Sequence, residues 1–440
     1  MKGMLLLATL TYGIGQSTNF LFQLHLLHLL GSSAYGNAGL AHLLLITLIF
    51  LADLGYSSIF LRQAPDHPDW LHDWACALGQ RLAATLLLLP LCSLAVSALV
   101  ADSAAFDYWL GAAPAALLAL CNFSSPLIAR GQRLLALLSG QIAWPVALLL
   151  SLVLPKHLPF SMATSAGITV SLGFAAQALV HLLLSRNPRL WLPKMGSGQL
   201  NAALHLSTLG ICGTLYDRLT PFLLAPLTPS FLPWYLLLSH ALNGLSGIQA
   251  QLSRLLLPGA ARDHGRARVL QAGSWTLQGT AALLISILLL QAVTLDSEQR
   301  HWLALAGILL LAWGTTVSGG FLSLPLIDGN RERPLARLFI ITMAIGAPLQ
   351  VLFAWAQAPE LLLWSRALCL ITIMLGVIRL QHLHLSTWGW LAMGIALLAG
   401  IAGFTAAGPW FGGVLALPLL VAVAGRRPSY RPYPTLQTST

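Results

Sequence analysis

The chain has 440 residues, of which 57% are hydrophobic and only 8% are charged. Ordinary soluble domains carry about 25% charged residues, so this composition excludes a soluble fold of the same length. The formal net charge of +10 does not indicate nucleic acid, because the basic residues stand in short loops between apolar segments and form no continuous face. Composition therefore predicts an integral membrane protein whose basic loops contact anionic membrane lipids.

Apolar segments of roughly 20 residues recur along the chain, and each is long enough to cross a hydrocarbon layer of about 30 Å. Backbone polar groups in lipid must be satisfied within their own segment, so we expect helices and not the short alternating strands of a barrel. The predicted fold class is an all-α, polytopic transmembrane bundle of about fourteen (twelve to fourteen) helices. The expected spans are residues 4–30, 37–61, 76–100, 108–129, 134–154, 159–184, 200–226, 232–256, 269–293, 302–327, 338–358, 361–381, 387–406 and 409–424.

The first of these helices carries a polar stripe. Tyr12, Gln16, Asn19 and Gln23 recur at three- or four-residue spacing and therefore share one helix face. Such a face can bind the hydroxyl groups of a sugar in a central cavity, or it can form hydrogen bonds between neighbouring helices. We take Gln16, Asn19 and Gln23 as candidate substrate-binding residues.

Basic residues test the segmentation independently, because cytoplasmic loops are enriched in Lys and Arg. With the N-terminus inside, nineteen basic residues fall in loops on the cytoplasmic side, whereas only Lys156 and Arg300 fall in loops on the other side. This imbalance predicts a multi-pass protein of the cell inner membrane with both termini in the cytoplasm.

A basic connection with two prolines separates the sixth predicted helix from the seventh. Laying the first helix on the seventh at an offset of 200 pairs Gly13 with Gly213, and Tyr35 with Tyr235. A repeat of six and six helices is common in transporters, whose substrate sites lie between the two halves. We predict two six-helix halves at residues 1–184 and 200–381, joined by a cytoplasmic interfacial linker at residues 185–199. Two additional helices follow at residues 382–424, and a cytoplasmic basic tail at residues 425–440.

A known pattern begins at Leu29 and reads LLGSSAYGNAGLAHLLLITLIFLADLGYSSIFLR. A short turn with a glycine and an aromatic-glycine pair (Tyr35 and Gly36) precedes a helix that ends in Asp53-Leu54-Gly55, and a basic residue, Arg62, follows. This resembles the opening of bacterial O-antigen and polysaccharide flippases of the multidrug/oligosaccharidyl-lipid/polysaccharide exporter superfamily. The chain departs from that pattern in a shortened outer turn and in having few charges inside the bundle.

Ionisable residues in the predicted helices are the next candidates, since each costs about 2.5 to 3.5 kcal/mol at the centre of a membrane helix. Asp217 and Arg218 lie in the outer part of the seventh helix, and Arg366 lies about six residues inside the twelfth. Two arginines at similar depth can bind a diphosphate through forked hydrogen bonds, with Asp217 orienting it or taking up a proton. The alternatives are a structural ion pair between helices and an Arg366 side chain that extends to lipid phosphates.

Four further residues are candidates for gating or coupling. Asp53 and Arg62 flank the inner end of the second helix, where a gate or a packing role is expected. His42 and His240 can relay protons because imidazole titrates near neutral pH, although a single histidine in a helix is more often a packing residue.

The sequence shows no motif of a soluble active site: it lacks a Walker loop, a GxSxG elbow and an HExxH pair. The five cysteines lie in or beside apolar segments without the spacing of metal ligands. We therefore expect no enzymatic activity, no metal and no cofactor.

The resemblance implies a flippase that moves a polyprenyl-diphosphate-linked oligosaccharide from the cytoplasmic to the periplasmic leaflet by alternating access. Its product would serve surface polysaccharide or O-antigen synthesis, with a polysaccharide polymerase or ligase as possible partner. One alternative is a cation-coupled exporter of drugs or other small molecules in the same superfamily, for which an acidic residue in the first helix is expected and absent. A membrane polysaccharide polymerase or ligase is a second alternative, which the short outer loops disfavour.

Overall fold

The computed structural model describes residues 2–62, 69–99, 103–257, 260–292, 296–329 and 331–381. In these residues every regular element is a helix, which confirms the predicted all-α class. The helices expected at 387–406 and 409–424, and the basic tail at 425–440, lie outside the described residues. The predicted total of fourteen helices therefore stays a prediction.

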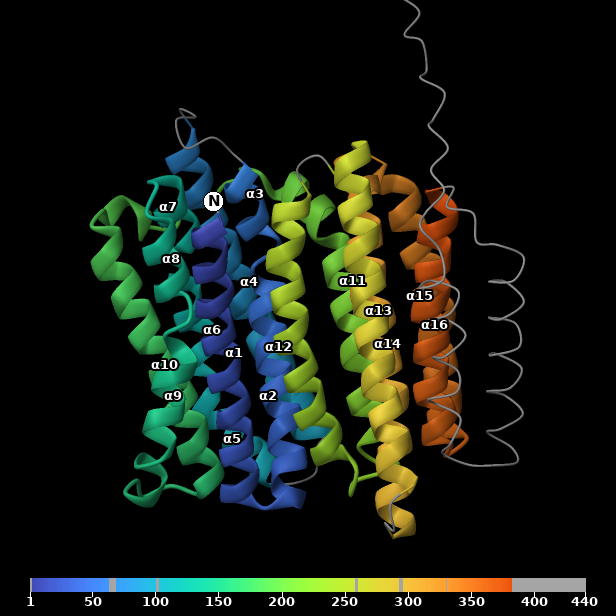
Figure 1. Ribbon diagram of the computed structural model, residues 1–440. Coiled ribbons are helices and arrows are strands. Elements are labelled where there is room, and N and C mark those ends of the chain that lie inside the picture. The colour runs from blue at the N-terminus through green and yellow to red at the C-terminus, as the bar shows by residue number, and fades with distance from the viewer. Residues whose placement is uncertain are drawn as a thin grey trace, which may run out of the picture. The chain divides into compact units, whose positions relative to one another are not determined.

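The described helices follow the order of the predicted spans (Figure 1). The α-helices are α1 (Lys2–Leu30), α2 (Ser32–Ala52), α3 (Tyr56–Arg62), α4 (Trp70–Leu99), α5 (Ser103–Ala112), α6 (Pro114–Leu118), α7 (Ser124–Ala129), α8 (Arg133–Ser139), α9 (Ala143–Ser151), α10 (Met162–Ser185), α11 (Leu200–Leu224), α12 (Leu232–Leu256), α13 (Asp263–Ala292), α14 (Ser297–Asp328), α15 (Glu332–Trp355) and α16 (Pro359–Leu380). Short 3₁₀ turns lie at Ala119–Cys121, Leu154–Lys156 and Pro188–Leu190.

Three spans that we expected to be continuous are interrupted, and one of them, 134–154, breaks between α8 and α9. The segment 37–61 breaks between α2 and α3, where Leu54 and Gly55 have φ of 51° and 79°. The segment 108–129 breaks at Asn122, whose backbone is extended (φ −76°, ψ 99°). These backbone conformations end the helical hydrogen bonding, whereas the apolar character that guided the prediction continues through them.

Eight helical segments are long and apolar enough to cross a membrane, judged by length and composition. They lie at Ser32–Ala52, Trp70–Ala98, Ser103–Ala129, Leu134–Lys156, Met162–Ser185, His301–Asp328, Arg333–Trp355 and Pro359–Leu380. Helices of this length and composition are those expected of a multi-pass membrane protein. The long helices α1, α11, α12 and α13 are not among these segments, as judged over the described residues.

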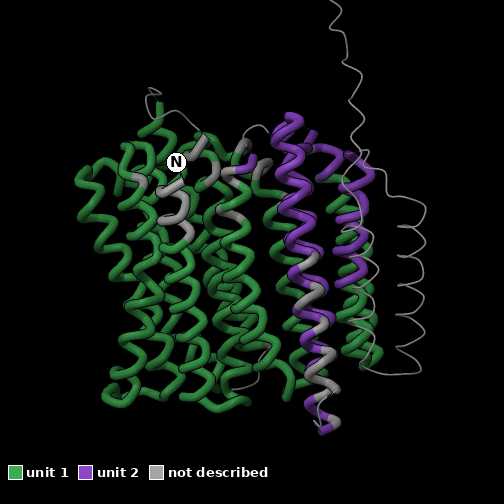
Figure 2. Tube along the Cα trace, in the orientation of Figure 1, with its two compact units in different colours: residues 1–255, 336–366 green, residues 256–335, 367–440 purple. Residues whose placement is uncertain are grey.

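The chain forms two compact units (Figure 2). Unit 1 comprises residues 1–255 and 336–366, and unit 2 comprises residues 256–335 and 367–440. Because these units follow contacts and not internal symmetry, the division into two six-helix halves stays a prediction.

Glycines allow the helices of unit 1 to approach closely. A Cβ at Gly111 of α5 would lie 2.7 Å from the backbone nitrogen of Ile168 in α10, and one at Gly167 of α10 would lie 2.8 Å from that of Ala112. The hydroxyl of Ser171 bridges the same crossing by donating to the Gly111 carbonyl at 2.6 Å. Small residues and hydroxyl donors of this kind hold membrane helices together.

Unit 2 is built on the packing of α13 against α14. The Ser318 hydroxyl of α14 donates to the Gly273 carbonyl of α13 at 3.2 Å. At one end of the pair, Val269 and Phe321 pack in a buried apolar cluster. The polar residues that the sequence analysis selected do not lie in this unit.

Candidate transport site

Three helices of unit 1 bring a charged cluster together. Asp217 of α11 forms an ion pair with Arg366 of α16. The second terminal nitrogen of Arg366, Nη1, donates to the hydroxyl of Tyr235 in α12 at 2.6 Å. Residues that the sequence separates by more than a hundred positions therefore form one polar contact.

Burial distinguishes the two partners of this ion pair. The Arg366 side chain is 10% exposed, whereas the Asp217 side chain is 39% exposed. Arg366 is thus held inside the protein by Asp217 and Tyr235, an arrangement that differs from an arginine extending to lipid phosphates. The carboxylate of Asp217 therefore remains partly accessible to solvent.

Arg218 contributes a second cation to the cluster. Its Nη1 lies 3.9 Å from the second carboxylate oxygen of Asp217, and its Nε is buried with no hydrogen-bond partner in the described residues. Asp217 is already engaged by Arg366, so the two guanidinium groups and one carboxylate leave one net positive charge. Arginine offers a planar fork of donors to an anion at such a position.

The two histidines selected from the sequence lie together, next to this cluster. The ring centroids of His42 in α2 and His240 in α12 are 5.6 Å apart. His42 Nδ1 is within hydrogen-bonding distance, 2.7 Å, of the Tyr108 hydroxyl, and the charge of Arg218 is close enough to act on both imidazole rings. In the described residues the Nε2 atoms of both histidines are buried without a partner.

The sequence analysis did not select Tyr235, Tyr108 or Gln350 as site residues. Tyr108 of α5 contacts His42, and Gln350 of α15 accepts a hydrogen bond of 2.8 Å from the hydroxyl of Thr220, one turn after Asp217. A buried glutamine inside an apolar helix was the available signal for Gln350. Tyr108 gave none, because tyrosine near a helix start is also typical of the membrane interface.

The polar stripe of α1 mostly packs against other helices. A Cβ at Gly244 of α12 would lie 3.3 Å from Gln16 Cβ, and Gly247 of the same helix lies against the Tyr12 ring. The amide oxygen of Gln23 accepts a hydrogen bond from the Tyr35 hydroxyl at 3.3 Å. These contacts match the helix-packing alternative that the sequence left open.

Two residues of the α1 stripe keep polar atoms without a hydrogen-bond partner in the described residues. These are the side-chain oxygen of Asn19 and the side-chain nitrogen of Gln23, and both atoms are buried. Of the three stripe residues proposed for substrate binding, Asn19 therefore keeps an acceptor that a sugar hydroxyl can use.

Asp53 lies away from the charged cluster, at the turn between α2 and α3. It accepts hydrogen bonds from the backbone nitrogen of Ser57 at 3.1 Å and from its hydroxyl at 2.9 Å. It also lies 3.4 Å from Nη2 of Arg81 in α4. Arg62 ends α3, and its side chain is outside the described part of the chain.

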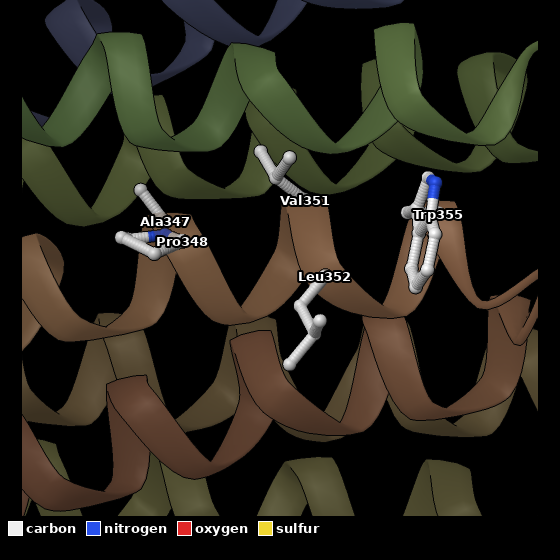
Figure 3. Close-up of a pocket in the computed structure, with 5 residues that line it drawn as sticks. All are labelled: Ala347, Pro348, Val351, Leu352 and Trp355. Carbon is white, nitrogen blue, oxygen red and sulfur yellow. The ribbon is translucent and has the colours of Figure 1, made fainter.

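An open apolar hollow of about 550 Å³ lies elsewhere in unit 1, on α15 (Figure 3). All five of its lining residues come from this one helix: Ala347, Pro348, Val351, Leu352 and Trp355. Since no charged group lines it, this hollow does not suit a polar headgroup. In the described residues, no group of three or more His, Cys, Asp or Glu side chains is arranged to hold a metal ion.

Comparisons with known proteins place the fold. No family model matches the chain, and no curated protein matches it. The crystal structure of the eukaryotic MATE transporter AtDTX14 does match, with a TM-score of 0.59 and 14% identity, over 87% of this chain and 96% of that chain. At this identity the likeness shows the fold alone.

MATE transporters belong to the multidrug/oligosaccharidyl-lipid/polysaccharide exporter superfamily. The chain therefore shares a fold with one member of the superfamily that the segment from Leu29 to Arg62 resembles. This likeness does not distinguish the O-antigen flippases within that superfamily.

Proposed function

We propose that the protein is a membrane transporter that exports an anionic substrate by alternating access. Two observations support this: the fold shared with a MATE transporter over 87% of the chain, and a partly buried charged cluster in unit 1, which also contains helices apolar enough to cross a membrane. Alternating access exposes a site between helices to one side of the membrane and then to the other.

The single observation that carries the substrate class is the surplus positive charge of the cluster. Asp217 neutralises Arg366, whereas Arg218 lies 3.9 Å from the same carboxylate and keeps most of its charge. The Nε atoms of both arginines are buried without a partner in the described residues. A charge in an apolar environment has an unfavourable free energy unless a counter-charge or water lies close to it. An anionic group of the substrate satisfies Arg218, and phosphate or carboxylate oxygens fit its donors.

One candidate substrate class is a small anionic molecule, exported in exchange for a cation. The likeness to a MATE transporter supports cation-coupled export of a small molecule at least as well as lipid flipping. The anionic character of that molecule rests on the surplus positive charge of the cluster alone. Because α1 has no acidic residue, the coupling ion would act at Asp217, the carboxylate of the cluster. Its accessible side chain suits exchange with water.

A second candidate class is a polyprenyl-diphosphate-linked oligosaccharide. The net positive charge suits the diphosphate, and the segment from Leu29 to Arg62 resembles the flippases that carry such lipids. The unpartnered Asn19 oxygen of α1 is available to the sugar, and the polyprenyl chain can stay in the bilayer. A polysaccharide polymerase or ligase would then use the product.

The two classes predict different consequences of deleting the gene. Mass spectrometry would measure polyprenyl-diphosphate glycans, while growth assays would measure sensitivity to toxic anionic compounds. A complete glycan repeat that accumulates in the inner leaflet, with loss of surface polysaccharide, supports the flippase. Increased sensitivity and compound retention without a glycan change support small-molecule export.

Other outcomes of the same experiment contradict the proposal. A repeat that reaches the outer leaflet but stays unpolymerised would indicate a polymerase or ligase. Unchanged glycans together with unchanged compound export, in a strain shown to produce the wild-type protein, would remove the case for an exporter.

A further inference from the structure

We propose that residues 186–198, called the strap below, form a fixed binding surface for the phosphate headgroups of anionic phospholipids. The strap joins α10 to α11 within unit 1. It is separate from the charged cluster of α11, α12 and α16, so the inference does not rest on the proposed transport function. Its basis is a rigid backbone that leaves apolar and basic side chains exposed together.

Side-chain and backbone hydrogen bonds fasten the strap to α4. The indole nitrogen of Trp74 donates to the Leu190 carbonyl at 3.0 Å, and the backbone nitrogen of Lys194 donates to the Ala75 carbonyl at 2.9 Å. Leu190 is buried in an apolar cluster with Trp74 and Phe60 of α3. The first half of the strap is therefore anchored, although it has little regular secondary structure.

The second half of the strap is fastened to the same helix. The side-chain nitrogen of Gln80 donates to the carbonyls of Gly196 and Ser197, the latter at 2.9 Å. A Cβ added at Gly79 would collide with the Lys194 backbone, and one at Gly196 would lie 2.8 Å from Cys76 Sγ. Close backbone packing of this kind fixes which strap side chains point outward.

Three large apolar side chains of this fixed segment remain outside the core. Trp191 is exposed, Leu192 is 63% exposed and Met195 is 90% exposed. The indole nitrogen of Trp191 donates to the Ser185 hydroxyl at 2.7 Å, so its ring is held in place. Exposed apolar groups at the end of a membrane helix are stabilised when they enter the boundary between headgroups and acyl chains.

Basic side chains accompany these apolar groups. Arg186, Arg189 and Lys194 are exposed, and residues 185–199 contain no Asp or Glu. A basic segment beside a membrane helix attracts anionic lipid. The charge of the strap thus complements phosphate headgroups, while Trp191, Leu192 and Met195 fit the acyl boundary below them.

The backbone conformation of Arg186 favours a ligand-binding role for its guanidinium group. Arg186 ends α10 with φ of 47°, in the left-handed region. Glycine is the usual residue at that position because a side chain there is strained. An arginine at a position where glycine fits better is expected when the guanidinium group has a ligand.

The test compares lipid binding by two charge-matched variants of the full-length protein. Native mass spectrometry in detergent would measure the affinity for phosphatidylglycerol and for phosphatidylcholine. In the strap variant Arg186, Arg189 and Lys194 are changed to Gln, and in the control variant Arg331, Arg333 and Arg337 are changed to Gln. Each basic residue near an anionic surface contributes roughly five-fold in affinity.

We expect the strap variant to bind phosphatidylglycerol at least about ten-fold more weakly, with unchanged binding of phosphatidylcholine. The control variant, which removes as many positive charges, should lose much less. Equal losses of phosphatidylglycerol affinity in the two variants would show that only the overall charge of the protein matters, and would overturn the proposal. Equal affinity of the wild type for both lipids would also overturn it, as would displacement of the lipid by millimolar inorganic phosphate.

A second variant separates lipid binding from folding. Arg186→Gly removes a charge but relieves the left-handed backbone, so its melting temperature should equal or exceed that of the wild type. Its affinity for phosphatidylglycerol should nevertheless fall several-fold. Unchanged affinity in this well-folded variant would contradict the role assigned to Arg186.

Discussion

At the scale of single residues, Arg218 carries most of the proposed chemistry. It is the cation of the cluster that Asp217 leaves largely unneutralised, because Asp217 pairs with Arg366. Its position, next to Asp217 inside a predicted membrane helix, was visible in the sequence. Its neighbours His42 and His240 were found separately, but their contact depends on how α2 and α12 pack.

Replacing Arg218 by Ala should lower export of the anionic substrate at least about ten-fold, since a charge-assisted hydrogen bond contributes roughly 1.5 to 3 kcal/mol. Arg218→Lys should retain an intermediate rate, because it keeps the charge but loses the planar fork. Transport would be measured in cells with immunoblots of the membrane fraction. The control variant is Arg379→Ala, which alters an exposed arginine of α16 and should leave transport unchanged. Normal export by the Arg218→Ala variant would refute the role proposed for Arg218.

The ion pair between Asp217 and Arg366 allows a test of stability. Removing one partner of a fully buried pair costs about 3 to 5 kcal/mol. Because Asp217 is 39% exposed, we expect Arg366→Gln to lower the free energy of unfolding by about 2 kcal/mol.

A double-mutant cycle with Asp217→Asn isolates that pair. The two substitutions together should destabilise less than the sum of the single ones, with a coupling energy above about 1 kcal/mol. Detergent-titrated unfolding of the purified protein would measure all four forms. Strict additivity would show that the pair contributes nothing measurable.

At the scale of elements, the turn between α2 and α3 shows what composition misses. Apolar runs predicted the positions of the long helices, because the thickness of the hydrocarbon layer and the need to hydrogen-bond every backbone group determine where such helices lie. They did not predict the breaks that produce the short helices α3 and α6 to α9. The interruption at Asp53-Leu54-Gly55 has no hydropathy signal. It depends on left-handed backbone at Leu54 and Gly55, and on the contacts of Asp53 with Ser57 and Arg81.

Two glycines with the same φ of 79° separate the effect of conformation from that of packing. A Cβ at Gly55 would lie 2.6 Å from Ser207 Cβ of α11, whereas a Cβ at Gly131 has nothing within 4 Å. Gly131→Ala should therefore destabilise by about 1 kcal/mol through its backbone alone. Gly55→Ala should destabilise by about 3 kcal/mol, because the contact with α11 must also shift.

Unfolding in detergent would compare these two glycine variants. Adding Ser207→Gly to Gly55→Ala should restore part of the lost stability, since it removes the colliding atom. If both glycine variants were equally destabilised, the close contact between α11 and the turn would play no part.

At the scale of the whole molecule, the sequence predicted a helical transmembrane bundle, and the fold shared with a MATE transporter confirms that class. Membership of the exporter superfamily stays a prediction from the segment between Leu29 and Arg62. The pairing of Arg366 with Asp217 and Tyr235 could not be predicted, because residues on three separate helices meet only after packing. The polar stripe of α1 illustrates the same limit. Its periodicity identified a shared face, but only the packed helices show that Tyr12 and Gln16 face glycines of α12.

Alternating access is the central claim, and distances between spin labels test it most directly. One pair would be placed at Ser33 and Ser230, near the starts of α2 and α12, and another at Gln132 and Leu252, near the start of α8 and the end of α12. The purified protein in lipid nanodiscs would be measured across a range of pH, with and without a polyprenyl diphosphate. The account predicts two distance populations for each pair, with proportions that shift in opposite directions at the two ends. A single, unchanged distance for both pairs under all conditions, in a protein that retains export activity with the labels attached, would contradict alternating access.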